Sequence, residues 1–175
     1  MPQGAGTTSR PTALNSCAAR HIWVALVTST MRRMPSACRS SAELRAFSMD
    51  PSGRINLIAH GAELASGQQL ATARNNLGGM PGGMITLSAD GQKEGIVWGT
   101  APAEGDANMM AEPGVVRAYD VTDFDPAPAR SAPAKLRLLW QQDGFTYSKF
   151  CPPVVADGKL LVPTYDGRVD VYELQ

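Results

Sequence analysis

The sequence has little of what metal sites, disulfide frameworks and nucleic-acid binding require. Two histidines, His21 and His60, are too few and too far apart for a zinc site. The three cysteines, Cys17, Cys38 and Cys151, include no adjacent pair and do not decide the redox compartment. Lys plus Arg and Asp plus Glu number 16 each, so the net charge gives no reason to expect nucleic acid or an anionic membrane as a partner.

Long hydrophobic runs are also missing. The apolar run 22–27 is too short to span a bilayer, which takes about 20 residues. No convincing signal peptide is present, because Arg32 and Arg33 lie between this run and Cys38, where a signal peptide carries no charge. We therefore expect no membrane span.

Acidic residues are absent from the first quarter of the chain. Residues 1–42 contain five arginines and no carboxylate, and their Ser- and Arg-rich composition resembles an organelle transit peptide. We expect this segment to be disordered, to be a targeting segment, or to be spurious sequence from a misassigned start. Residues 43–175 are then the folded domain.

From Glu43 onward, short runs of strand-forming residues alternate with turns. The expected strands are 44–49, 55–59, 84–88, 95–100, 114–120 and 136–141, followed by three more within 150–174. We expect a long loop over 101–113, an exposed Pro- and Ala-rich insertion over 125–134 and an irregular stretch over 62–77. This pattern predicts an all-β fold, as a sandwich, barrel or propeller.

The end of the chain carries the strongest local signal. Asp157-Gly158 and Asp166-Gly167 each separate two apolar runs, which predicts two hairpins with positive φ at both turn positions. Val169 and Val171 are expected on one face of the last strand. Such a three-stranded meander needs a neighbouring layer for its apolar face, so the segment favours a repeat architecture.

Four strings carry a resemblance to a known family. These are GMITLSADGQKEGIVWGT, GVVRAYD, LRLLW and FCPPVVADGKLLVPTYDGRVDVYEL, and together they resemble the final blades of a PQQ-like (pyrroloquinoline-quinone-like) repeat β-propeller. Ala118-Tyr119-Asp120 and Leu139-Trp140 match elements of the family repeat, whereas the insertion 123–135 replaces its turn. The resemblance covers residues 79–174 and extends in weaker form to 43–60.

The resemblance implies a partial β-propeller of about two to three blades. We assign the outer part of one blade to 43–60, a full blade to 84–141 and three strands of another to 150–174. Rings of this kind have about 4–8 blades, so these blades cannot close one. The end blades would each expose an apolar face, and the expected partners are the missing blades, as in a fragment of a longer product, or another protein chain.

The expected function follows from the same resemblance. We expect a non-catalytic scaffold or a ligand- or protein-binding module, with no catalytic residue, no metal site and no cofactor in this chain. The alternative is the C-terminal fragment of a PQQ-dependent quinoprotein dehydrogenase, with PQQ and calcium. Trp98 and Trp140 could stack on a quinone, but we expect them to plug the space between adjacent sheets. The family implies a periplasmic or extracellular location.

Weaker patterns have simple structural interpretations. Asp120, Asp123 and Asp125 could chelate calcium but more simply form a solvated acidic turn. Cys151 is expected to be a buried apolar side chain. Phe145 and Tyr147 are the only aromatic residues that could serve a secreted sugar- or polymer-binding module. The glycine pairs 78–79 and 82–83 lack the Lys-Ser/Thr of a phosphate cradle. Core or loop packing is preferred to soft-metal binding for Met80, Met84, Met109 and Met110.

Overall fold

The computed structural model describes residues 21–26, 43–64, 83–91, 93–104, 107, 110–127, 129 and 132–173. Ten strands form within these ranges. They are β1 (His21–Leu26), β2 (Glu43–Met49), β3 (Ile55–Leu64), β4 (Met84–Asp90), β5 (Lys93–Pro102), β6 (Pro113–Asp125), β7 (Ala134–Thr146), β8 (Val154–Ala156), β9 (Lys159–Pro163) and β10 (Val169–Glu173). The predicted all-β class is confirmed.

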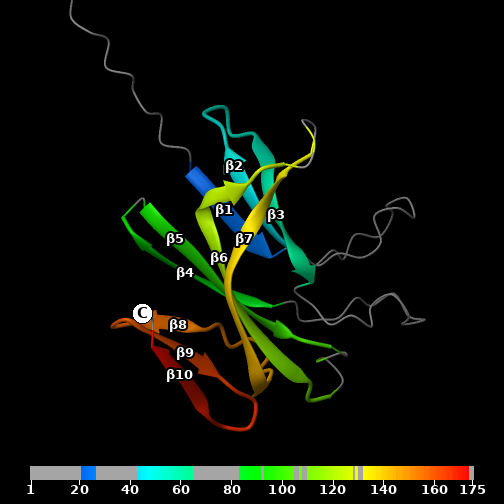
Figure 1. Cartoon of the computed structure of the whole chain (residues 1–175), viewed down its shortest axis with the longest axis vertical. Helices are drawn as coiled ribbons and strands as arrows, with labels where there is room; N and C mark the ends of the chain where they lie inside the picture. The colour runs from blue at the N-terminus through cyan, green and yellow to red at the C-terminus, as the bar shows by residue number, and fades with distance from the viewer. Residues whose placement is uncertain are drawn as a thin grey trace, which may run out of the picture.

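The strands form two sheets. The larger has seven strands in the order β1-β2-β3-β7-β6-β5-β4, and the smaller has three in the order β10-β9-β8. Figure 1 shows β1–β3 at one end of the molecule and β8–β10 at the other, with the long strands β6 and β7 between them. Within the described ranges no helix is present that is long and apolar enough to cross a membrane.

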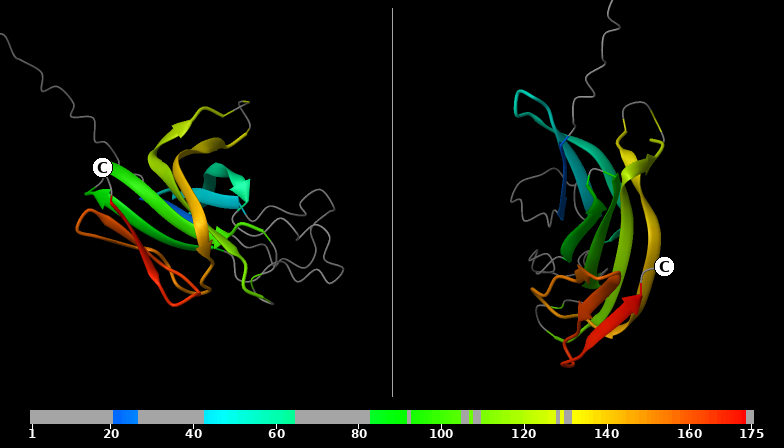
Figure 2. Two further views of the ribbon diagram at one scale, coloured as in Figure 1. Left: turned by 60° about the horizontal axis from the view of Figure 1, so that its bottom comes forward. Right: turned by 90° about the vertical axis from the view of Figure 1, so that its left-hand side faces the viewer.

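The large sheet curls strongly along β6 and β7, as Figure 2 shows. The register shifts between Gly114 and Val115, between Ala118 and Tyr119, and between Asp120 and Phe124. Such bulges bend a strand and increase its twist. The two faces of this part of the sheet therefore meet different neighbours.

Two hydrophobic cores lie on opposite sides of the β4–β7 part of the sheet. The first gathers Val97, Tyr119, Val121 and Leu136 against Leu44, Ala46 and Ala59 of β2 and β3. The second gathers Trp98, Val116, Ala118 and Phe145 against Leu160 and Val162 of β9. The curl of the large sheet thus brings β2–β3 over one face of the β4–β7 meander, and β8–β10 pack on the other face.

Most predicted strands and turns are found where the sequence placed them. β2 and β3 form the expected hairpin, and β4, β5, β6 and β7 form the expected four-stranded antiparallel meander. Asp157 and Gly158 both have positive φ, at 50° and 68°. The other turn differs, because positive φ is found at Gly167 (78°) and not at Asp166. This loop is longer, with the backbone N–H of Thr164 donating to the carbonyl of Arg168 at 2.9 Å.

Two expectations about the first part of the chain need correction. The segment 43–60, expected to be the outer part of a blade apart from 84–141, belongs to the same sheet as that segment, because β3 pairs in parallel with β7 at Ala59↔Ala134 and His60↔Lys135. The segment 1–42 includes the strand β1, which pairs antiparallel with β2 from His21↔Met49 to Leu26↔Leu44. The other residues of 1–42 lie outside the described ranges, so their expected character stays a prediction.

Several predicted loops are shorter than expected. β3 continues to Leu64, into the stretch 62–77 that was expected to be irregular, and residues 65–77 lie outside the described ranges. β6 continues to Asp125 and β7 begins at Ala134, so both strands reach the borders of the expected insertion. Pro126 and Ala127 of that insertion are exposed, as predicted.

Candidate interaction surface

The contact between the two sheets centres on three aromatic side chains. Trp98 of β5 and Trp140 of β7 meet edge-on with ring centroids 6.3 Å apart, and Trp140 meets Tyr172 of β10 at 5.3 Å. Such edge-to-face pairs contribute about 0.5–1.5 kcal/mol beyond their area burial. The indole N–H of Trp98 also donates to Ser88 Oγ at 2.8 Å. The two tryptophans therefore fill the space between sheets, as the sequence predicted.

The small sheet has one packed face. Leu160 and Val162 of β9 are 0% exposed, and Val155 and Tyr172 pack partly buried beside them. Tyr147 joins this sheet to the larger one through its bridge to Thr164, and the N–H of Tyr165 donates to the carbonyl of Thr146 at 3.0 Å. The inner face of β8–β10 thus packs against the large sheet of the same chain.

The opposite face of the same sheet is apolar and open. We call it the outer valine face and define it by Val154, Leu161, Pro163, Val169 and Val171. The cross-strand pairs Val154↔Leu161 and Leu161↔Val171 form one row, and Pro163↔Val169 forms the next. Val154, Val169 and Val171 are 49%, 54% and 53% exposed. A β-sheet with apolar side chains on both faces is typical of a layer that is covered on both sides.

The segment that leads into β8 also exposes apolar side chains. Phe150 and Pro152 are exposed like Val154, whereas Cys151 and Pro153 between them are partly or fully buried. Phe150 is 69% exposed and has φ of 62°, a conformation that is unusual for a bulky residue. Residues with such backbone conformations cluster at active sites, ligand clamps and switch regions.

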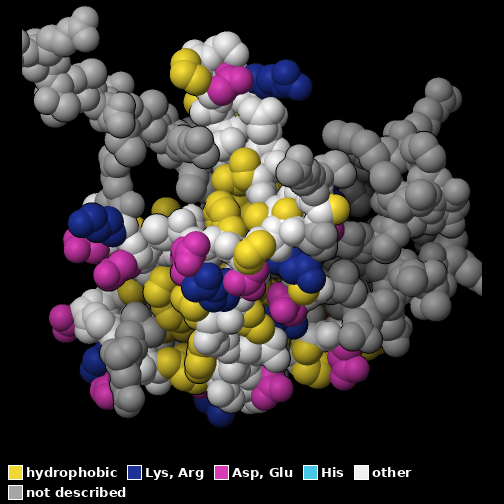
Figure 3. Space-filling view, turned by 45° about the horizontal axis from the view of Figure 1, so that its top comes forward, with side chains coloured by type: hydrophobic (Ala, Val, Ile, Leu, Met, Phe, Trp, Pro, Cys, Tyr) yellow, Lys and Arg dark blue, Asp and Glu magenta, His cyan; other side chains and the backbone are white. Residues whose placement is uncertain are grey.

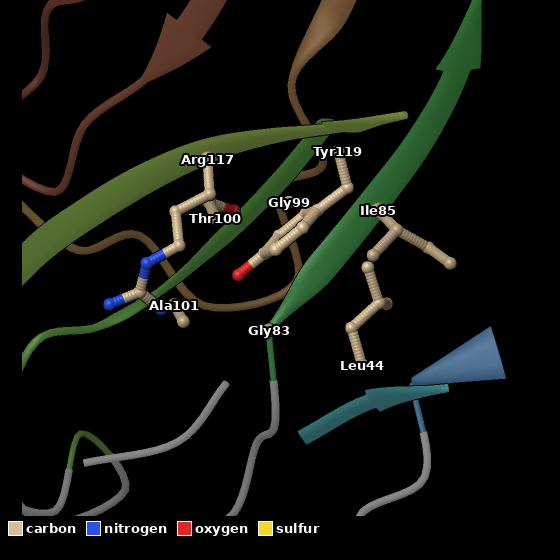
Figure 4. A pocket seen from close by; sticks show the side chains of 8 residues that line it. All are labelled: Leu44, Gly83, Ile85, Gly99, Thr100, Ala101, Arg117 and Tyr119. Atoms are coloured by element: carbon tan, nitrogen blue, oxygen red, sulfur yellow. The ribbon is translucent and has the colours of Figure 1, made fainter. Parts of the chain in front are cut away.

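A pocket between the described strands β4, β5 and β6 is too small for a ligand. Figure 4 shows it beside Tyr119, Arg117, Ile85 and Leu44. Its free volume is ≈ 20 Å³, which is room for about one water molecule. The Tyr119 hydroxyl donates to Glu63 Oε2 at 2.9 Å, and burial raises the pKa of Tyr119, with Glu63 adding to the rise. These contacts stabilise the first core.

The three aspartates that were considered as calcium ligands, and more simply expected to form an acidic turn, lie around an arginine. Arg137 Nη2 lies 2.9 Å from Asp123 Oδ2, its Nε lies 3.0 Å from Asp125 Oδ1, and its Nη1 lies 4.0 Å from Asp120 Oδ2. Asp120 Oδ1 also accepts the backbone N–H groups of Thr122 and Asp123. Arg137 thus occupies the place between these acids and offsets part of their charge, and among the described residues they are not placed to hold a metal ion together. Figure 3 shows basic and acidic side chains intermingled on one face of the molecule.

A second polar cluster was missed by the sequence reading. His60 Nδ1 lies 2.6 Å from Glu43 Oε2, and Arg45 Nη2 lies 3.6 Å from Glu43 Oε1. Arg45 and His60 are direct cross-strand partners, so the cluster depends on the β2–β3 register. No local motif identifies it, because 17 residues separate His60 from Glu43. Within the described ranges no group of three His, Cys, Asp or Glu side chains is placed to hold a metal.

The remaining predicted residues fall in several places. Phe145 and Tyr147, the only candidates for a polymer-binding aromatic pair, are 5% and 2% exposed and so do not offer an exposed aromatic surface. Cys151 is a free, partly buried thiol. Met110 is exposed and Met84 is half-buried on β4. Gly83 packs tightly, since a Cβ there would lie 2.3 Å from the Thr100 carbonyl oxygen. Cys17, Cys38, Met80, Met109, Gly78, Gly79 and Gly82 lie outside the described residues.

Searches for similar proteins give no support for any family. No family model, curated protein or solved structure matches this chain.

Proposed function

We propose that this chain is a non-catalytic β-sheet scaffold, a partial propeller of the PQQ-like repeat type, whose outer valine face packs against a further β-sheet. The observation that carries the proposal is the open apolar face formed by Val154, Leu161, Pro163, Val169 and Val171. The sheet that covers it would come from missing blades or from another protein chain.

The internal packing of the chain supports this proposal. Its two cores already pack β2–β3 on one face of the β4–β7 meander and β8–β10 on the other. The outer valine face is the position at which the next layer would follow. The β4–β7 meander has four antiparallel strands, the number typical of a propeller blade. The parallel pairing of β3 with β7 is a departure from that pattern.

The energetics also favour a covering layer. Val154, Val169 and Val171 each leave about half of the side chain exposed. Burying the remainder would contribute about 1 kcal/mol for each valine. Residues on the solvent-exposed face of an antiparallel sheet are normally polar, because that face meets water.

The dehydrogenase alternative receives no support from the described residues. Trp98 is 5% exposed and meets Trp140 edge-on, so its ring does not fit a stacked quinone. Asp120, Asp123 and Asp125 pair with Arg137 and do not fit a calcium ion.

The proposed location of this scaffold is the periplasm or the extracellular space, as the resemblance to PQQ-like propellers implies.

Hydroxyl-radical footprinting with mass spectrometry tests the proposal. The protein in its native assembly is compared with the isolated recombinant chain, and oxidation is measured at Val154, Val169 and Val171. We expect several-fold slower oxidation of these valines in the native assembly. Met110, which is 65% exposed in a loop, serves as the exposed control, and the fully buried Leu160 and Val162 serve as the protected controls. Equal oxidation of the three valines in both samples would reject the proposal.

A further inference from the structure

We draw no further inference here: the strongest candidate, the apolar outer face of the β2–β3 hairpin on which Ile55 and Leu57 are exposed, supports none, because nothing in the part of the chain that the structure describes shows what covers it.

Discussion

Trp140 meets Tyr172 edge-on across the two sheets, with ring centroids 5.3 Å apart and planes inclined at 66°. Trp140 belongs to β7 of the large sheet, and Tyr172 belongs to β10 of the small one. The pair therefore fixes the small sheet against the large one, and with it the direction in which the outer valine face points.

Removal of the Trp140 side chain should loosen this junction. We expect Trp140→Ala to lower the free energy of unfolding by about 3 kcal/mol, because a large apolar side chain leaves a cavity between the sheets. Leu139→Ala is the matched control, since the neighbouring Leu139 is 47% exposed and should cost less than about 1 kcal/mol. Urea unfolding followed by circular dichroism measures both. Equal stability of the Trp140 variant and wild type would contradict the assigned role.

Gly114 should not accept a side chain. A Cβ at Gly114 would lie 2.3 Å from Phe145 Cε2, and Phe145 is itself only 5% exposed within the second core. We expect Gly114→Ala to destabilise the chain by about 1–3 kcal/mol through overpacking. Gly99→Ala is the control, because the nearest atom to its Cβ would be 3.6 Å away. Thermal unfolding compares the two variants, and a Gly114 variant no less stable than the Gly99 variant would refute the prediction.

Thr100 and Thr164 should respond in opposite ways to the same substitution. Thr100 is 2% exposed, and its Oγ1 has no hydrogen-bond partner among the residues that the structure describes. Thr100→Val should therefore be neutral or stabilising, because it removes a buried hydroxyl without a partner. Thr164 Oγ1 donates to the Arg168 carbonyl at 3.1 Å and accepts the Arg168 N–H at 3.3 Å. Thr164→Val should cost about 1 kcal/mol. Urea unfolding of both variants checks the difference in sign.

Alkaline pH should destabilise the fold through its buried tyrosines. Burial raises the pKa of Tyr147 from 10.0 to about 12, with a further contribution from Cys151. The folded state thus favours the neutral phenol, so this stabilisation is complete below pH 10 and is lost as the pH rises through about 12. Urea unfolding measured across this range should show a less steep decline for Tyr147→Phe than for wild type. Identical slopes would show that Tyr147 does not contribute.

Local sequence signals predicted most of the elements. Asp157-Gly158 gave the correct hairpin, and the apolar alternation gave β2, β4 and β5 close to their observed positions. The sequence also predicted that Val169 and Val171 share a face of β10. It did not show that this face is the open one, because alternation is the same whichever side packs against a neighbour.

Contacts between distant segments account for what the sequence did not show. The parallel pairing of β3 with β7 joins Ala59 to Ala134, far apart in the chain, and no local pattern specifies it. β6 and β7 extend to the borders of the predicted insertion because Arg137 of β7 pairs across with Asp123 and Asp125 of β6. The propeller resemblance itself remains a proposal.

The structure of the native assembly, determined by electron cryomicroscopy, tests the proposed scaffold role most directly. The account predicts a further β-sheet about 10 Å from β8–β10, in contact with Val154, Leu161 and Val171. Native particles in which these three side chains face solvent would contradict it.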